Sequence, residues 1–464
     1  MSVVARLLDG IGTSGHALVQ WTSTRDAAAS AVFGLILAAL VAARVYRGRR
    51  RKAALARAAR LQLGIHNLKE HLRVRLAEPA APFADGIDRA PTLGASEAFE
   101  ADIEAAAKTV LLEAGGRRGK AKHILRKHLN GSKLNGSEAA YWRQLGALSL
   151  IDNTRDALKA YARAAELAPD DAQAQMLLGV LSLRTGRLEG AETAFRRLIE
   201  LADNGAGGDG ARHRAGTMLG DVLAAKGERE AALAAYETAQ RDAAALAERE
   251  PNTAAWQRDL SIAHDRIGDL LLDQGQTDLA LESCRRSLAI ADALVKRDPA
   301  NVVWQRDLSV AHDRVGEALE RKGDLEGALT SFRCGLALAE AIARRDSERP
   351  DNRWDISISF DRIGDVLSAK GKAVEALAAY RRGLELAVEA AEAEPTRTGW
   401  QRDLAVSYHK VGLLEALTGN DSEARELLER GRTIIARLDR IATYQAQWRS
   451  DLVKFDEALG NLGP

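Results

Sequence analysis

The chain has 464 residues, with 66 Lys and Arg against 65 Asp and Glu, so its formal net charge at pH 7 is +1. Two cysteines are too few for a disulfide framework, which excludes the class of small disulfide-stapled domains. Because the overall charge is balanced, a basic stretch near the N-terminus leaves the remainder slightly acidic.

An apolar segment near the N-terminus predicts a membrane span. Residues 27–43 are uncharged and almost wholly apolar, which is the short end of the length that a spanning helix needs. Basic residues follow at once and favour a cytoplasmic location for what comes after, since positive charge stays inside. We therefore expect an extracytoplasmic tail (1–26), a transmembrane helix (27–46) and repeats on the cytoplasmic side, in a bacterial inner membrane because abundant Arg and Ala suit a high-GC bacterium. The predicted membrane-interface residues are Trp21, Arg44, Tyr46, Arg47, Arg49, Arg50, Arg51 and Lys52.

Other interpretations of this region are a cleaved signal peptide and a nucleic-acid site. A long, weakly charged leader and a basic cluster where a cleavage site would be expected argue against cleavage. The basic residues between Arg44 and Arg60 have no acid among them and could also bind anionic headgroups. They have little aromatic interleaving, so we expect no nucleic-acid partner.

Residues 47–136 lead from the predicted span to the repeats. We expect a basic juxtamembrane helix and a proline-containing linker over 47–95, in which the leucine-bearing stretch 53–76 forms a stalk or pairs with another chain. Residues 96–136 then predict helices that form a cap or a degenerate repeat. The glycine-rich loop 204–210 lacks the ending of a phosphate loop and is interpreted as a flexible joint.

The C-terminal half carries an internal repeat of 48 residues. One glycine series and a second, seven positions later, keep the same phase, which indicates one supersecondary unit stacked on its own copies. In the copy that starts near Trp256, helical spacing runs to Leu272, a polar turn follows, and a second helix runs from Asp278 to about Arg297. The two series are Gly220, Gly268, Gly316, Gly364, Gly412 and Gly460, and Gly227, Gly275, Gly323, Gly371 and Gly419.

The spacings inside each helix pair carry a family resemblance. Phe360-x-x-Ile363-Gly364 precedes Ala376-x-x-x-Tyr380, and the same pattern recurs in other copies. The chain thus resembles the tetratricopeptide repeat family. Two upstream units are closer to the family's usual length, with Trp142-x-x-Leu145-Gly146 before Ala157-x-x-x-Tyr161, and Leu178-Gly179 before Ala191-x-x-x-Phe195.

The resemblance implies an all-α, right-handed superhelical solenoid of helix-turn-helix repeats, joined to the single transmembrane helix. We expect shorter units over 137–203 and a 48-residue array over 211–464 that ends in a capping helix. The longer period implies helices about two turns longer than usual. The recurring tag WQRDL begins these units at Trp256, Trp304 and Trp400. Its tryptophan is either a ligand-stacking platform or, as we favour, a wedge between repeats.

A search for catalytic chemistry finds no nucleophile elbow, metal-ligand cluster or nucleotide signature. His264 and His312 invite a metal or proton-relay interpretation, but Phe360 and Tyr408 fill the same slot, so packing is favoured. Cys284 and Cys334 fall on second helices, where we expect small buried side chains. The sequence therefore predicts neither an enzyme nor a cofactor.

Acidic residues recur on the first helices. In tetratricopeptide proteins such positions commonly line the concave groove, so the resemblance implies a ladder of carboxylates that faces a protein or peptide partner and would attract a basic one. The equal alternative is that Arg266, Arg314, Arg362 and Lys410 pair with these acids between repeats. The predicted groove residues are Asp265, Asp269, Asp313, Glu317, Asp361 and Asp365.

These observations predict a membrane-anchored tetratricopeptide scaffold that holds a protein partner on the cytoplasmic face. A second hypothesis is a homo-oligomeric structural protein of the membrane. A third places a catalytic module in residues 96–136, or makes the protein a regulator of a separate enzyme.

Overall fold

The computed structural model describes residues 138–150, 153–205, 208–345, 349–395, 397–441 and 446–462. In these ranges every regular element is an α-helix. The predicted tail (1–26), membrane span (27–46), linker (47–95) and helical region 96–136 lie outside the described residues. Within the described ranges, no helix combines the length and the apolar character needed to cross a bilayer.

The five N-terminal helices of the described array, α6 to α10, are short. Each has 13 to 16 residues, and side-chain caps define two of their starts: Asn153 accepts from the backbone N–H groups of Arg155 and Asp156, and Asp171 caps the next pair in the same way. They are α6 (Glu138–Leu150), α7 (Thr154–Leu167), α8 (Ala172–Arg184), α9 (Leu188–Asp203) and α10 (Ala211–Ala225).

The helices that follow are longer. Where α7 has 14 residues, α13 has 21, a difference of about two helical turns, as the 48-residue period predicted. They are α11 (Arg229–Arg249), α12 (Ala254–Asp273), α13 (Thr277–Arg297), α14 (Val302–Lys322), α15 (Leu325–Ala343), α16 (Pro350–Ala369), α17 (Ala373–Ala393), α18 (Thr398–Leu417), α19 (Asp421–Ile441) and α20 (Ala446–Asn461).

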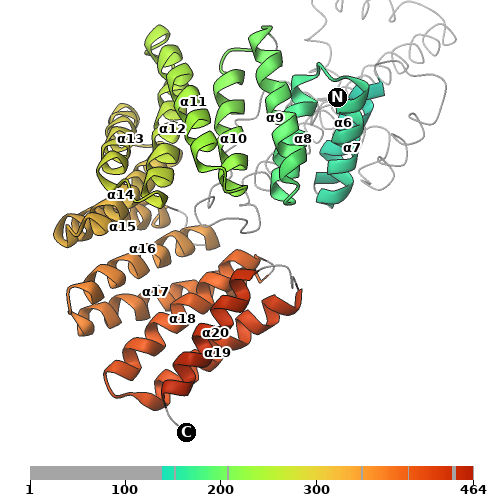
Figure 1. Cartoon of the computed structure of the whole chain (residues 1–464). Helices are drawn as coiled ribbons and strands as arrows, with labels where there is room; N and C mark the ends of the chain where they lie inside the picture. The colour runs from blue at the N-terminus through green and yellow to red at the C-terminus, as the bar shows by residue number, and fades with distance from the viewer. Residues whose placement is uncertain are drawn as a thin grey trace, which may run out of the picture.

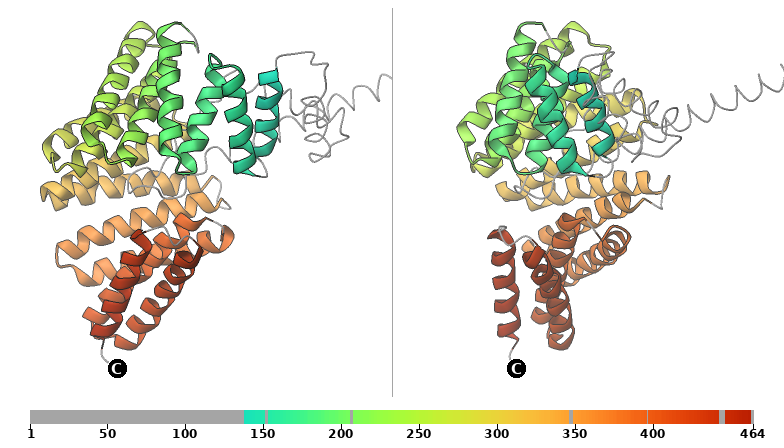
Figure 2. Two further views of the ribbon diagram at one scale, coloured as in Figure 1. Left: turned by 45° about the vertical axis from the view of Figure 1, so that its right-hand side comes forward. Right: turned by 90° about the vertical axis from the view of Figure 1, so that its right-hand side faces the viewer.

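Consecutive helices pack as pairs, and each pair stacks on the next, so α6–α20 form one array. The array runs from α6 across to α13 and then turns down toward α20 (Figure 1), and two side views show the same curved path (Figure 2). First helices of neighbouring units also contact one another: α8 contacts α10, α10 contacts α12, and α12 contacts α14. They therefore lie on the inner side of the curve, and we call their shared surface the inner face.

The first glycine series makes room for the second helix of the same unit. A Cβ on Gly316 would lie 2.5 Å from Cε1 of Phe332, and one on Gly364 would lie 2.5 Å from the ring of Tyr380. The residue sixteen positions later fills the space in each case. The first of the shorter units makes the same contact one residue earlier, where Tyr161 lies against Gly146, whereas in the second Phe195 lies against Gly179, again sixteen positions later.

The second glycine series closes the turn within each pair. Gly227, Gly275, Gly323, Gly371 and Gly419 all have φ between 72° and 87°, the left-handed region that favours glycine. For example, Gly323 ends α14 and lets α15 begin two residues later.

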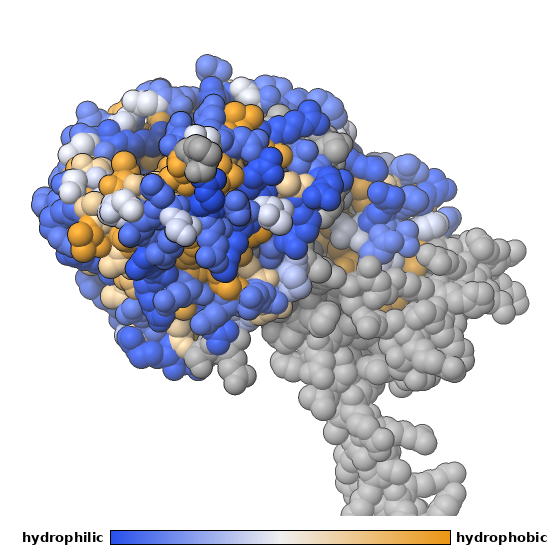
Figure 3. Space-filling model, turned by 90° about the horizontal axis from the view of Figure 1, so that it is seen from below, coloured by the Kyte–Doolittle hydropathy of each residue, from blue (hydrophilic) through white to orange (hydrophobic). Residues whose placement is uncertain are grey.

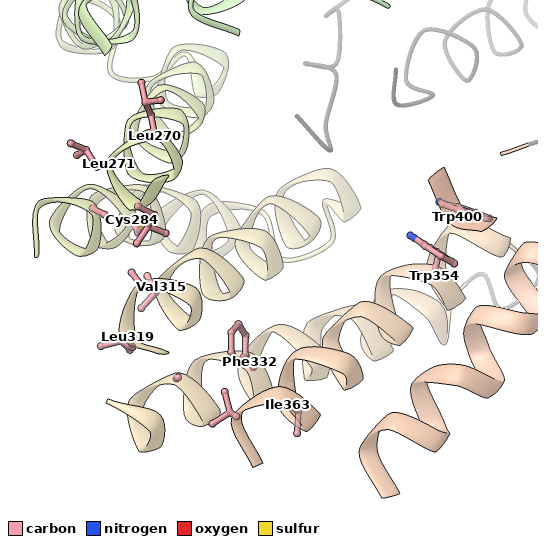
Figure 4. Packing of buried hydrophobic residues seen from close by; sticks show 14 of the residues in the cluster. Leu270, Leu271, Cys284, Val315, Leu319, Phe332, Trp354, Ile363 and Trp400 are labelled. Carbon is pink, nitrogen blue, oxygen red and sulfur yellow. The ribbon is translucent and has the colours of Figure 1, made fainter. Parts of the chain in front are cut away.

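One buried hydrophobic cluster extends from Val180 to Leu414, through almost the whole array. Figure 4 shows Val315, Phe332 and Ile363 from three successive helices packing toward one another. The array continues across the loop 204–210, since α9 packs against α10 and Gly210 abuts the ring of Trp256. The predicted flexible joint is therefore packed at its Gly210 end.

Candidate partner-binding surface

Ion pairs cross from one repeat to the next along the inner face, and four of them join equivalent positions, while Arg362 Nη1 also binds Asp313 Oδ2 at 2.5 Å. In each pair, a cation on a first helix binds an acid on the first helix before it. The four equivalent pairs are Arg266 Nε with Asp221 Oδ1 (3.1 Å), Arg314 Nε with Asp269 Oδ1 (3.1 Å), Arg362 Nη2 with Glu317 Oε1 (2.6 Å) and Lys410 Nζ with Asp365 Oδ2 (2.7 Å). We call this set the inner ladder.

The acid position and the cation position of the inner ladder both lose their charged residue at the same repeat junction. One period after Asp365 the acid position holds Leu413, and one period after Lys410 the cation position holds Ala458. Both pair members are thus replaced by apolar residues at the same junction. This matched replacement supports the interpretation that the acids pair between repeats.

The predicted groove residues are buried to different extents. Asp269, Glu317 and Asp365 belong to the inner ladder. Asp313 is only 6% exposed, and its Oδ1 lies 2.6 Å from where a Cβ on Gly335 would be, so it is packed against its own second helix. Asp361 is half-buried in the same way against Gly383 and accepts from the Ser407 hydroxyl at 2.6 Å, while Asp265 lies half-buried on α12.

Sequence reasoning missed Asp221, the first acid of the inner ladder. It lies 48 residues before Asp269, so the period itself could have found it. Its side chain is 1% exposed and also accepts from the Tyr236 hydroxyl at 2.7 Å.

Burial and pairing move the pKa values of the ladder acids in opposite directions. Burial raises the pKa of Asp269 to about 7, although Arg314 opposes this shift. For Glu317, Arg362 and Arg314 outweigh the cost of burial and lower the pKa to about 2. Burial also raises the pKa of Asp361 to about 6.

A second series of ion pairs between repeats uses the arginine and the aspartate of the WQRDL tag. The arginine of one unit binds the aspartate of the next: Arg258 Nη2 donates to Asp307 Oδ1 (3.1 Å), Arg306 Nε lies 3.1 Å from Asp355 Oδ2, and Arg402 Nε donates to Asp451 Oδ2 (2.9 Å). We call these contacts the tag clamps. At the junction between α16 and α18, which has no tag clamp of this kind, Trp354 occupies the arginine position. Its ring stacks on that of Trp400, with 4.8 Å between the ring centroids (Figure 4).

The tryptophans lie between repeats. Trp256, Trp354, Trp400 and Trp448 are all buried, and Trp256 Nε1 donates to Glu250 Oε2 at 2.9 Å. Rings buried in this way cannot serve as an open stacking platform for a ligand. The wedge interpretation therefore holds for these four residues, whereas Trp304 of the tag is only half-buried.

The histidines and cysteines show packing roles. His264 is buried beside the Ser283 hydroxyl, and burial lowers the pKa values of both His264 and His312. Within the described part of the chain, no three His, Cys, Asp or Glu side chains gather as metal ligands would. Cys284 is buried against Gly268 as expected, but Cys334 is exposed, because it lies on the outer side of α15 where Arg286 stands one period earlier.

Seen from below, the molecular surface is mainly hydrophilic with scattered apolar residues (Figure 3). A shallow, open hollow of about 350 Å³ between α13 and the end of α14 is lined mostly by charged side chains, among them Arg285, Arg286 and Lys322. Neither feature has the enclosed, apolar character of a small-molecule site.

A family model described as tetratricopeptide repeat matches residues 152–206. The chain contains tetratricopeptide repeats. Three later helix pairs repeat the glycine–aromatic contact of the matched region, at Gly220, Gly316 and Gly364. Repeats of this family bind protein partners. A search of curated proteins found no match.

Three solved structures are similar to parts of the chain. They are BtubC (BKLC) from P. vanneervenii (16% identity, TM-score 0.40, 52% of this chain and 90% of that chain), the apo form of RapI (15%, 0.48, 77% and 94%) and the APC/C hetero-tetramer Cut9–Hcn1 (15%, 0.41, 80% and 57%). At these identities and TM-scores, none of them indicates a partner for this chain.

Proposed function

We propose that this protein is a membrane-anchored scaffold whose right-handed tetratricopeptide array binds a protein partner on the cytoplasmic face. The observation that carries the proposal is the inner face, where regular charges and exposed apolar side chains lie on rigid, stacked helices. On α18, Leu413 and Leu417 are 40% and 81% exposed, one turn apart and beside the Lys410–Asp365 pair. Such a mixed surface suits a peptide or helix that carries both charge and apolar anchors.

The predicted carboxylates contribute unequally to this surface. Glu317 and Asp365 keep 24% and 36% of their side chains exposed, so a basic partner can reach them. Asp313 is buried and acts within the array. Because the exposed acids already have cationic partners, we expect them to steer and orient a basic ligand more than to supply its affinity.

The test is an affinity capture of the full-length protein from its native membrane, read by mass spectrometry. One variant changes Leu413 and Leu417 to Ser on the inner face, and the control changes Leu279 and Val374 to Ser, which are 54% and 80% exposed on second helices. We expect a partner whose yield falls at least tenfold with the inner-face variant and stays unchanged with the control.

Recovery of the protein alone from all three samples would contradict the scaffold. That outcome would favour the alternative of a homo-oligomeric membrane protein, which sedimentation of the purified protein at micromolar concentration would then show as a multimer. The absence of an enzymatic role and of a cofactor stays part of the proposal, since residues 96–136 lie outside the described ranges.

A further inference from the structure

The inner face opens progressively toward the C-terminal half of the array. The acids of the inner ladder are 1%, 15%, 24% and 36% exposed at Asp221, Asp269, Glu317 and Asp365. Their cationic partners show the same trend, from 10% at Arg266 to 27% at Lys410. The stretch formed by α14, α16 and α18 is therefore the accessible part of this face.

This accessible stretch combines apolar and acidic groups. Leu417 is 81% exposed and Leu413 is 40% exposed on α18, in a chain where most large apolar side chains of the array are buried. Glu320 of α14 lies within electrostatic range of Asp365, Glu317 and Lys410. Burial, followed by the charges of Asp365 and Glu317, raises the pKa of Glu320, so this carboxylate lies in surroundings that a further cation would improve.

The same chain contains a segment of complementary chemistry. Residues 44–60 hold eight Arg and Lys and no acid, and leucines follow at 61, 68, 72 and 76. Residues 138–464 hold 44 Lys and Arg against 54 Asp and Glu, a net charge of −10. Most of the excess positive charge of the N-terminal part thus lies in a short basic segment, and the helical array carries a matching excess of negative charge.

The chain length allows the two parts to meet. Residues 61–137 join them, and 77 residues can span up to about 250 Å when extended, whereas a helix of the array is about 30 Å long. A segment linked to its site in this way acts at an effective concentration up to the millimolar range. Even a contact with a dissociation constant near 100 μM would then be occupied most of the time.

We propose that the basic segment 44–60 binds in cis to the inner face of α14, α16 and α18, over Leu413, Leu417 and the acids Glu317, Glu320 and Asp365. Its arginines lie against the acids, and apolar side chains of the segment cover the two leucines. The proposal concerns a contact within one chain and does not depend on any partner being found. A partner that used the same surface would have to displace the segment first.

The experiment measures proximity in the purified full-length protein in neutral detergent, where no anionic lipid is present. Cys334 is changed to Ser, Lys52 to Cys, and a second cysteine replaces either Leu417 or Val374, which are exposed to the same degree, 81% and 80%. Cys284 is kept, because it is buried and burial raises the pKa of its thiol. A bismaleimide reagent then joins the two cysteines within one chain in dilute solution.

We expect cross-linking to position 417 at least five times faster than to position 374 at low ionic strength. The ratio should fall toward one in 0.5 M NaCl, where the screening length is about 4 Å, and also when Arg49, Arg50 and Arg51 are changed to Gln. Equal rates at both positions overturn the proposal, and so does a preference that survives salt and the Gln changes. Protection of the segment from trypsin that arises only with anionic vesicles, together with equal rates in detergent, would assign it to lipid headgroups and also overturn the proposal.

Discussion

At the residue scale, each glycine series has its own physical requirement. In the series that contains Gly316, every glycine but Gly460 must lack a side chain because a side chain of the second helix lies against it, the Phe332 ring in the case of Gly316. The series that contains Gly323 needs a positive φ to close the turn. Two independent constraints in the same phase explain why this repeat is so regular in sequence.

Gly316 and Gly460 make a matched pair for testing the first requirement. A Cβ on Gly316 would lie 2.5 Å from the Phe332 ring, whereas a Cβ on Gly460 would meet nothing within 4 Å. We expect Gly316→Ala to lower the free energy of unfolding by about 1–3 kcal/mol, since the core must shift. Gly460→Ala should raise it by up to about 1 kcal/mol, because alanine favours the helix. Urea denaturation of both variants measures this, and equal effects would show that the ring contact is unimportant.

Asp269 predicts a specific dependence of stability on pH. Its pKa in the folded protein, about 7, is above the ordinary value of 3.8, so the folded state binds this proton more tightly than the unfolded state does. The stabilisation is present at low pH and is lost as the pH rises toward 7. Asp269→Asn should therefore gain stability relative to the wild type between pH 4 and pH 7, by an amount on the order of 1 kcal/mol.

Glu317→Gln serves as the control with the opposite sign. The folded-state pKa of Glu317 is about 2, below the ordinary 4.5, so its ionised form contributes stability that appears as the pH rises from about 2 to 4.5. The variant should lose stability relative to the wild type over that interval. Urea midpoints across pH 3–8 that changed alike in both variants would contradict the assignment of the two shifts.

At the scale of the element, the tag clamp that holds α20 is more deeply buried than the clamp between α14 and α16. Asp451 and Arg402 are 6% and 16% exposed, whereas Arg306 and Asp355 are 33% and 34% exposed. Because a less hydrated pair interacts more strongly and leaves a costlier unpaired charge, we expect Asp451→Asn to increase amide hydrogen exchange throughout α20. Asp355→Asn should change exchange in α16 only slightly, as expected for exposed pairs. Similar increases in both helices would argue against burial as the cause.

The sequence predicted the helices well, but it left two interpretations of their charges equally open, and the structure shows the pairing between repeats. The turn between Asp273 and Thr277 and the helix that ends at Arg297 were both expected from periodicity, and the structure has them there. By contrast, periodicity places Asp269 and Arg314 at equivalent spacings whether they bind a ligand or each other. Their contact spans 45 residues and depends on how two repeats stack, which local sequence does not specify.

Trp354 shows the same limit for a single side chain. In the copy that contains Trp354, Asn352-Arg-Trp354-Asp-Ile stands in place of WQRDL, and the repeat register places this tryptophan at the arginine position of the clamp. Asn352 takes the usual tryptophan position, is buried and accepts from Arg306 Nη2 at 2.8 Å. Only the stacked neighbour, Trp400, shows why the exchange is tolerated.

At the scale of the whole molecule, the charge of the chain is unevenly distributed. The array has a net charge of −10, which repels the anionic cytoplasmic surface of a membrane, and the basic segment 44–60 has a charge that such a surface attracts. If the protein is membrane-anchored as we propose, this distribution predicts attachment through the N-terminal part and not through the array. The location of the apolar segment 27–43 directly before the basic residues agrees with this arrangement.

A predicted span and a purely electrostatic attachment differ in how the protein leaves the membrane. If residues 27–43 span the bilayer, the full-length protein should stay in the membrane fraction through 1 M salt and alkaline carbonate, and a variant without these residues should be released. The orientation is tested by cysteine labelling with an impermeant maleimide, because exposed Cys334 should react only after the inner membrane is opened, whereas a cysteine in place of Ser2 should react before. Release of the full-length protein by salt alone would contradict the span, and early labelling of Cys334 would reverse the orientation, because the exposed thiol lies in the array itself.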